Sequence, residues 1–210
     1  EEGAYRTLGH PLDPLQPAGI PTHLPMGTHD DRDKMLAVMA ERRPEAPPVH
    51  GKFVSIIESK AANWFLLDSL EGAHQIAGGL GQAQLSWLFE ALASRPDKPA
   101  ILVGHHHLET GPKTLSVPGW RDPEAFKKVL LAHRHVAAYV FGHGHDWRIR
   151  PLPAAGMHLA SLPPTAYVFQ QGRPSGWVMA SLSASGLKLS LHALDRAHPQ
   201  HGESHALGWL

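Results

Sequence analysis

Apolar residues recur along the chain with two different periods, which predict helices and strands in turn. A spacing of three and four residues over 82–94 predicts a helix, and its apolar stripe comprises Leu85, Leu88, Phe89 and Leu92. A second helix is predicted to begin at Pro123, with Asp122 as its N-cap. Two further helices are expected near the start of the chain, a short one within 1–20 and another over 31–43.

Compact apolar runs bounded by polar residues, Gly or Pro predict strands. They cover residues 20–26, 53–58, 64–67, 100–103, 136–141, 147–152, 157–162, 177–182 and 187–191. The runs at 53–58 and 64–67 suit an antiparallel pair, and Gly186 suits a hairpin turn between the last two strands. Helices that alternate with strands, followed by a series of short strands, predict a layered α/β sandwich.

The length of the chain suits one domain. Its 210 residues, 42% of them hydrophobic, are enough to bury a core. We expect this α/β domain to span residues 1–195. Residues 196–210 are polar and contain several histidines, which predicts a loose C-terminal tail.

Composition excludes several classes of function. Lys and Arg together number 19, as do Asp and Glu together. The chain therefore has no excess of basic residues that would indicate a nucleic-acid polymer or an anionic membrane as a partner. The absence of Cys excludes disulfide scaffolds, thiolate zinc sites and Cys nucleophiles. No apolar run approaches the roughly 20 residues that a membrane span needs. A cytoplasmic location is the default expectation, which an export signal in a preceding segment would change.

Histidine is unusually frequent, with 17 residues, and two clusters of it follow predicted strands. His143-Gly144-His145 comes directly after the strand at 136–141. Residues i and i+2 of an extended segment point the same way, so these two imidazoles can face one site. Since imidazole is the commonest metal ligand, the pattern predicts a metal site. The alternative is two solvent-exposed side chains in a His-rich protein.

The second cluster is a run of three histidines, His105, His106 and His107, after the strand at 100–103. At least one of the three must face away from its neighbour. The run is either a polar loop with incidental histidines or, together with the first cluster, a source of ring nitrogens for a zinc, manganese or iron site.

A polar segment of four residues, 28–31, opens the predicted helix at 31–43. It supports two interpretations that are compatible with each other. Thr28 can cap the helix while the carboxylate of Asp31 reaches back, as in a capping box. Alternatively, His29 can contact a phosphate, because helix N-termini favour anions.

The motifs resemble those of the calcineurin-like metallophosphoesterases, in particular the branch that includes the class III cyclic-nucleotide phosphodiesterases. That family has, in chain order, D-x-H, G-D, G-N-H-[DE], a strand that ends in His, and G-H-x-H. The matching segments here are Gly27-Thr28-His29-Asp30 for the third motif, Val103-Gly104-His105-His106 for the fourth and Gly142-His143-Gly144-His145 for the fifth. Leu66-Leu67-Asp68-Ser69 matches a strand ending in L-D-S that the branch carries between the third and fourth motifs. Several motifs in the right order make the resemblance specific.

The chain also departs from the family pattern. It contains neither D-x-H nor G-D, which in the family supply two Asp ligands and one His ligand. Thr28 stands where the family has an Asn ligand, and a hydroxyl is a poorer ligand than an amide oxygen. The opening residues, Glu-Glu-Gly-Ala-Tyr-Arg, resemble the stretch that follows G-D in relatives. The resemblance therefore implies an α/β/β/α sandwich that is incomplete at its N-terminus.

The resemblance implies a set of roles for the histidines. Two divalent ions, Mn, Fe or Zn, roughly 3.5–4 Å apart would be expected in the intact fold. His105 and His143 would serve one ion and His145 the other. His29 would contact the phosphate and protonate the leaving oxygen. The substrate would be a small-molecule phosphodiester or phosphomonoester, and residues 1–210 alone would show little turnover because the bridging carboxylate is absent.

Two other functions stay open from the sequence. A non-catalytic relative could keep the fold as a binding module, which Thr28 favours slightly. The His-rich surface could instead sequester metal. The identity of the substrate and the oligomeric state are not specified by any motif.

Overall fold

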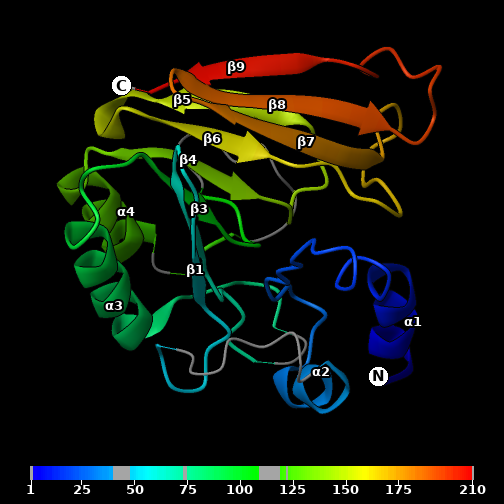
Figure 1. Cartoon of the computed structure of the whole chain (residues 1–210), viewed down its shortest axis with the longest axis horizontal. Helices are drawn as coiled ribbons and strands as arrows, with labels where there is room; N and C mark the ends of the chain where they lie inside the picture. The colour runs from blue at the N-terminus through cyan, green and yellow to red at the C-terminus, as the bar shows by residue number, and fades with distance from the viewer. Residues whose placement is uncertain (1, 40–47, 73–74, 109–118, 122, 210) are drawn as a thin grey trace.

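The computed structural model of the chain describes residues 2–39, 48–72, 75–108, 119–121 and 123–209 (Figure 1). Its helices are α1 (Glu2–Leu12), α2 (Arg32–Val38), α3 (Gly81–Ala93) and α4 (Pro123–Ala132), with a short 3-10 helix at Pro153–Ala155. Its strands are β1 (Ser55–Glu58), β2 (Asn63–Leu66), β3 (Ala100–Val103), β4 (Val136–Phe141), β5 (Arg148–Leu152), β6 (Met157–Ser161), β7 (Gly176–Ser183), β8 (Gly186–Ala193) and β9 (Ser204–Gly208). Within these ranges no helix has the length and apolarity needed to cross a bilayer.

The strands form two sheets. The larger has the order β1-β2-β3-β4-β6-β5, in which β2, β3, β4 and β6 are parallel and the edge strands β1 and β5 pair antiparallel to their neighbours. The smaller is an antiparallel sheet of order β7-β8-β9. Because the carboxyl ends of parallel strands meet at the same edge, the loops that follow β2, β3, β4 and β6 gather on one side of the large sheet.

The two faces of the large sheet are covered by different layers. Leu102 and Tyr139 are fully buried on the face that packs against α3 and α4. Their neighbours Ile101 and Val140 point the opposite way and pack against the three-stranded sheet. Successive side chains of a strand alternate between faces, so both faces of β3 and β4 are apolar. The chain is therefore a layered α/β sandwich, as the strand and helix order predicted.

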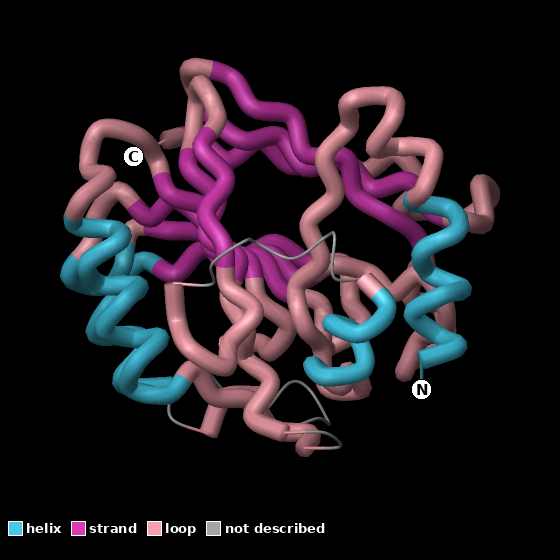
Figure 2. Tube along the Cα trace, turned by 60° about the horizontal axis from the view of Figure 1, so that its bottom comes forward, coloured by secondary structure: helices cyan, strands magenta, loops and turns pink. Residues whose placement is uncertain are grey.

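The helices α1 and α2 form a separate part of the molecule, and Figure 2 shows them on the side opposite to α3 and α4. Their apolar residues surround a third cluster, which comprises Tyr5, Met26, Met35, Met39, Phe53 and Leu70. Leu70 lies just after β2, so this cluster joins the N-terminal helices to the edge of the large sheet where the parallel strands end.

The predicted elements of the centre are confirmed almost to the residue. The strands β3 and β4 have the predicted bounds, α3 starts and ends one residue earlier than predicted, and β1 and β2 form the predicted antiparallel pair. Gly186 follows the turn between β7 and β8, opposite Ser183. The helix α4 begins at Pro123 as predicted, while its predicted N-cap, Asp122, lies outside the described residues.

Three predictions near the ends of the chain were wrong in part. Residues 20–26 run without strand pairing to the described residues, because apolar residues alone do not make a strand without a neighbour for the backbone. The expected loose tail contains β9, which pairs antiparallel with β8 and buries Leu207 in the apolar cluster between the sheets. The helix predicted over 31–43 ends as α2 at Val38, and residues 40–47 lie outside the described residues.

Candidate metal centre

The loops that follow β3 and β4 are joined by backbone hydrogen bonds. The amides of Gly142 and His143 both donate to the carbonyl oxygen of His105, at 3.2 and 2.9 Å. This places the first histidine of each predicted cluster at the same point of the sheet edge. The two clusters, 38 residues apart in the chain, thus form one site.

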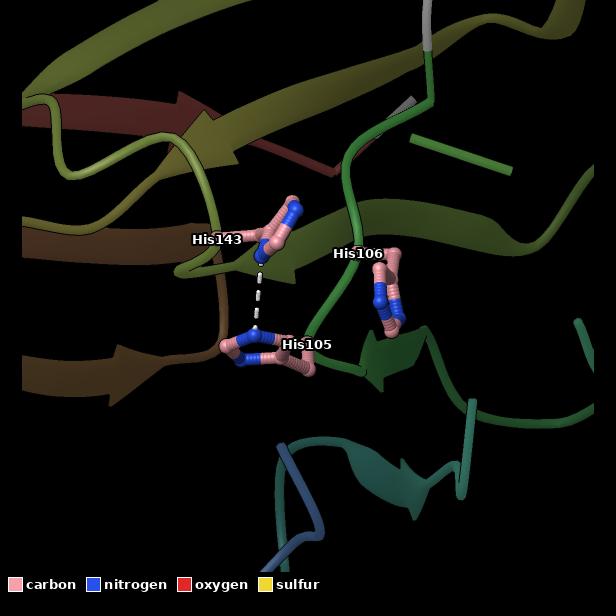
Figure 3. Close-up of side chains that lie close together, drawn as sticks. All are labelled: His105, His106 and His143. Carbon is pink, nitrogen blue, oxygen red and sulfur yellow. Dashed lines mark hydrogen bonds between the residues drawn. The ribbon is translucent and has the colours of Figure 1, made fainter. Parts of the chain in front are cut away.

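Three imidazoles converge there, from His105, His106 and His143 (Figure 3). One ring nitrogen from each lies within 4.8 Å of the others. Nε2 of His105 is 3.0 Å from Nδ1 of His143, a distance at which one ring donates a proton and the other accepts it. His106 and His143 are buried and His105 is partly buried. The predicted pairing of His105 and His143 is present, and His106 joins them.

Thr28 completes this cluster from a distant segment of the chain. Its side chain is buried, and its hydroxyl oxygen lies 3.3 Å from Nε2 of His106 and 3.2 Å from Nδ1 of His143. The capping-box interpretation was therefore wrong, because Thr28 faces the imidazoles rather than the helix. The N-cap of α2 is Asp31, whose carboxylate accepts a hydrogen bond from the amide of Lys34.

His106 is held in place from both sides of its ring. Nδ1 lies 2.8 Å from the hydroxyl of Ser69, and Nε2 lies 3.0 Å from the carbonyl oxygen of Ile76. The ring also lies against Gly78, where any Cβ would overlap it. Ser69, Ile76 and Gly78 thus orient His106 toward Thr28 and His143, since a carbonyl oxygen and a hydroxyl fix the plane of the ring.

Burial and mutual repulsion keep His105 and His106 uncharged at neutral pH. Burial, followed by the positive charge that His106 and His143 would carry, lowers the pKa of His105 to about 3. Burial lowers the pKa of His106 to about 4, against a small opposing effect of its hydrogen bond to Ile76. Neutral imidazoles have a lone pair to offer, which is the form that binds a metal ion.

His145 and His29 flank the cluster without entering it. His145 has a left-handed backbone, with φ of 47°, and its Nδ1 donates to the carbonyl oxygen of Tyr167 at 2.8 Å. His29 is exposed on the turn between Gly27 and Asp30. Burial is the main cause that lowers the pKa of His145, and the charge on His29 adds a smaller lowering effect there and at His105.

The described residues suit one divalent cation. Three imidazole nitrogens and the Thr28 hydroxyl give four potential donors, the number that zinc prefers, once Nε2 of His106 gives up the proton that it donates to the carbonyl oxygen of Ile76. No carboxylate belongs to the metal-ligand group found within the described ranges. A second ion beside His145 would thus depend on ligands other than those gathered here.

A buried ion pair connects the two segments that carry the site. Nε and Nη2 of Arg32 donate to the two carboxylate oxygens of Asp68 at 2.6 and 2.8 Å. Asp68 is fully buried and also accepts hydrogen bonds from the amides of Phe53 and Leu70. Arg32 begins α2, next to the His29 turn, and Asp68 precedes the Ser69 that contacts His106. The pair therefore fixes the two segments relative to each other.

Comparison with solved structures shows which fold this is. A dimetal phosphatase from Danio rerio superimposes with a TM-score of 0.74 at 15% identity and covers 98% of this chain and 77% of its own. A purple acid phosphatase from yellow lupin superimposes with a TM-score of 0.57 at 12% identity, over 90% of this chain and 39% of its own. These similarities establish the metallophosphoesterase fold.

Sequence comparison finds relatives that are named cyclic nucleotide phosphodiesterases. A probable cyclic nucleotide phosphodiesterase from Rhodopseudomonas palustris is 34% identical over 149 residues, which are 69% of this chain and 52% of the relative. The chain belongs to the calcineurin-like metallophosphoesterase family. The 3',5'-cyclic adenosine monophosphate phosphodiesterase CpdA of Escherichia coli is 30% identical over 122 residues, 55% of this chain and 42% of the relative.

Two further results limit what family membership implies for this chain. The chain spans about half the length of the curated relatives it matches. No protein-family model matches it.

His106 is a residue of the site to which the sequence motifs gave no role. The family pattern places the ligand of the fourth motif at His105. Three consecutive histidines leave open in the sequence which of them faces the site. In the structure His106 faces it as well, since its Nε2 contacts the hydroxyl of Thr28.

Proposed function

We propose that this chain is part of a metal-dependent phosphoesterase that hydrolyses small-molecule phosphodiesters or phosphomonoesters. The observation that carries the proposal is the convergence of Thr28, His106 and His143 with His105 at the edge of a metallophosphoesterase sheet. The names of the sequence relatives, cyclic nucleotide phosphodiesterases, support the phosphodiester as the substrate class.

The side chains have distinct roles in this proposal. His105, His106 and His143 hold one divalent cation, of manganese, iron or zinc, and His145 contributes to a second. When bound, the cations neutralise the equatorial oxygens of the phosphoryl group and activate the attacking water. Because their pKa values lie near 3 and 4, His105 and His106 stay neutral and keep their lone pairs at neutral pH.

His29 is proposed to act on the leaving group. It is exposed at the turn before α2, close enough to the cluster for its charge to lower the pKa of His105. An imidazolium there can orient the phosphate and give its proton to the leaving oxygen, as a general acid does.

The 210 residues alone are proposed to turn over slowly. The cluster contains three imidazoles and one hydroxyl, without a carboxylate from the described residues. A bridging carboxylate would hold two cations close together by neutralising part of their charge. We therefore expect weak retention of the second cation in this chain.

Hydrolysis of bis-p-nitrophenyl phosphate with added Mn²⁺ tests the proposal. It should be assayed for the 210-residue chain and for the full product of its gene, each beside a His143→Ala variant. We expect the full product to hydrolyse the ester and the variant to lose at least about 100-fold in kcat/KM. His133→Ala is a matched control, because His133 is also buried but contacts Val129 and Phe89 away from the cluster. Equal rates for His143→Ala and the unchanged protein would refute the site, and a full product without metal-dependent hydrolysis would favour the binding module.

A further inference from the structure

The loop that follows β6 carries two exposed aromatic side chains. Tyr167 is 58% exposed and Phe169 is 45% exposed. Their ring centroids lie 5.8 Å apart and the ring planes meet at 68°. Exposure of large apolar rings to water is unfavourable, so a pair of them on one loop is a surface that ligand binding would stabilise.

The loop is held rigidly against the rest of the fold. Its anchors are the backbone bonds from Leu162 to Phe141 (2.7 Å) and from Gly176 to Pro164 (2.8 Å), the ion pair of Arg173 with Asp146 (2.9 Å), and the contact of His198 with the carbonyl oxygen of Gly172 (3.1 Å). Because these contacts fix both ends of the loop, the two rings are presented with a reduced loss of freedom on binding.

The rings border the proposed metal centre through His145. The plane of Phe169 stacks on the imidazole of His145 with centroids 4.1 Å apart and an interplanar angle of 4°. Tyr167 accepts the hydrogen bond from Nδ1 of the same imidazole, and its ring meets it edge-on at 5.0 Å. His145 in turn lies two residues after His143 in the same turn, where its amide donates to the carbonyl oxygen of Gly142 at 3.1 Å. The loops after β3, β4 and β6 emerge at the same sheet edge, which explains the juxtaposition.

We propose that Tyr167 and Phe169 form a stacking subsite for the aromatic base of a nucleotide whose phosphate lies at the histidine cluster. This inference rests on the proposed function and adds the part of the substrate that the histidines do not touch. The exposed parts of the two rings suit the flat face of an aromatic base, and the nearby Arg173 is already paired with Asp146. Bases stack on such rings with little dependence on their identity.

The test compares two ligands that differ only by the base. Adenosine 5'-monophosphate and ribose 5-phosphate are titrated calorimetrically into the Mn²⁺-loaded full gene product and into its Tyr167→Leu and Phe169→Leu variants. In the unchanged protein the base should strengthen binding by about 5- to 150-fold, the range that stacking on aromatic side chains supplies. Each Leu variant should reduce this ratio at least about 3-fold, apart from any change in affinity that the two ligands share through the contact of the rings with His145.

Two controls separate stacking from a general disturbance. Tyr167→Phe keeps the ring and should preserve the ratio. Phe89→Leu removes an equally exposed ring from α3, on the helical face of the sheet, and should also preserve it. Equal affinities for the two ligands, or no detectable binding of either, would overturn the inference. A protein that hydrolyses bis-p-nitrophenyl phosphate but binds both ligands equally would lose only this inference, and one that prefers the nucleotide without hydrolysing esters would lose only the proposed function.

Discussion

The hydroxyl oxygen of Thr28 lies 3.2 Å from Nδ1 of His143, although 115 residues separate the two in the chain. The same oxygen is 3.3 Å from Nε2 of His106, so one short side chain touches two of the three converging imidazoles. Replacing it tests whether the cluster holds a cation. Thr28→Val keeps the shape but removes the oxygen, and we expect the affinity for Mn²⁺ to fall about 10-fold. Thr28→Asn supplies an amide oxygen and should raise it by a similar factor.

Isothermal titration with Mn²⁺ measures both changes. Thr7→Val is a suitable control, because the Thr7 hydroxyl only donates to the carbonyl oxygen of Gly3 on the exposed side of α1. Its affinity should match that of the unchanged protein. If Thr28→Val bound Mn²⁺ as well as the unchanged protein, the hydroxyl would have no part in the site.

Gly78 is expected to be irreplaceable for the orientation of His106. A Cβ at this position would overlap the imidazole of His106. The ring could move away only by breaking its hydrogen bonds to Ser69 and Ile76. We expect Gly78→Ala to weaken Mn²⁺ binding by at least about 10-fold and to destabilise the protein by about 1–3 kcal/mol. Gly3→Ala, where a Cβ meets nothing, should leave the Mn²⁺ affinity unchanged and should not destabilise the protein, since Ala is the better helix former in α1. Unchanged Mn²⁺ affinity in Gly78→Ala would show that His106 is not a ligand.

The buried ion pair of Arg32 and Asp68 should matter far more for stability than an exposed one. Asp68→Asn leaves the guanidinium of Arg32, whose side chain is only 20% exposed, without its counter-charge. Breaking such a pair from one side costs about 3–5 kcal/mol, and urea denaturation should show a loss of this size. Glu58→Gln is the matched control: it breaks the pair with Arg95 at the surface and should cost less than about 1 kcal/mol. Comparable losses in the two variants would contradict the assignment of Asp68 as the link between the His29 and His106 segments.

The central strands could be predicted from the sequence because one physical rule governs them. The strands β3 and β4 are buried on both faces, so every residue from Val136 to Phe141 is apolar and the run ends where the burial ends. Local rules were sufficient there. The same holds for the histidine clusters, since polar side chains directly after a buried strand must lie at the sheet edge.

Other features depended on contacts that no local pattern encodes. Residues 20–26 have the apolar character of a strand but pair with no strand among the described residues, and β9 has little apolar character yet pairs with β8. Thr28 obeys the capping-box spacing, but its hydroxyl finds two distant imidazoles and Asp31 caps the helix instead. Which of three consecutive histidines meets Thr28 depends on the turn after β3, and spacing alone does not fix that turn.

The low pKa values of the clustered histidines predict how the metal-free protein responds to acid. An unfolded histidine has a pKa near 6.5, whereas burial holds His106 at about 4 and His105 at about 3 in the folded protein. Between these pKa values the unfolded chain binds protons that the folded chain does not bind. The free energy of unfolding must therefore fall as the pH is lowered from about 6.5 toward 4. For His106 alone the loss at pH 4 is about 3 kcal/mol, and below about pH 3 this contribution no longer changes.

Urea denaturation of the EDTA-treated protein at pH 7, 5.5 and 4 measures this dependence, and the His106→Gln variant isolates the share of one ring. Because Gln does not titrate, the variant should lose less stability than the unchanged protein over the same interval, by about 3 kcal/mol at pH 4. His50→Gln changes an exposed histidine in a turn before β1 and should leave the slope as it was. Parallel curves for His106→Gln and the unchanged protein would mean that His106 gains its proton as easily in the folded chain as in the unfolded one. The proposal that the histidines at this sheet edge are neutral and able to bind a cation would then be wrong.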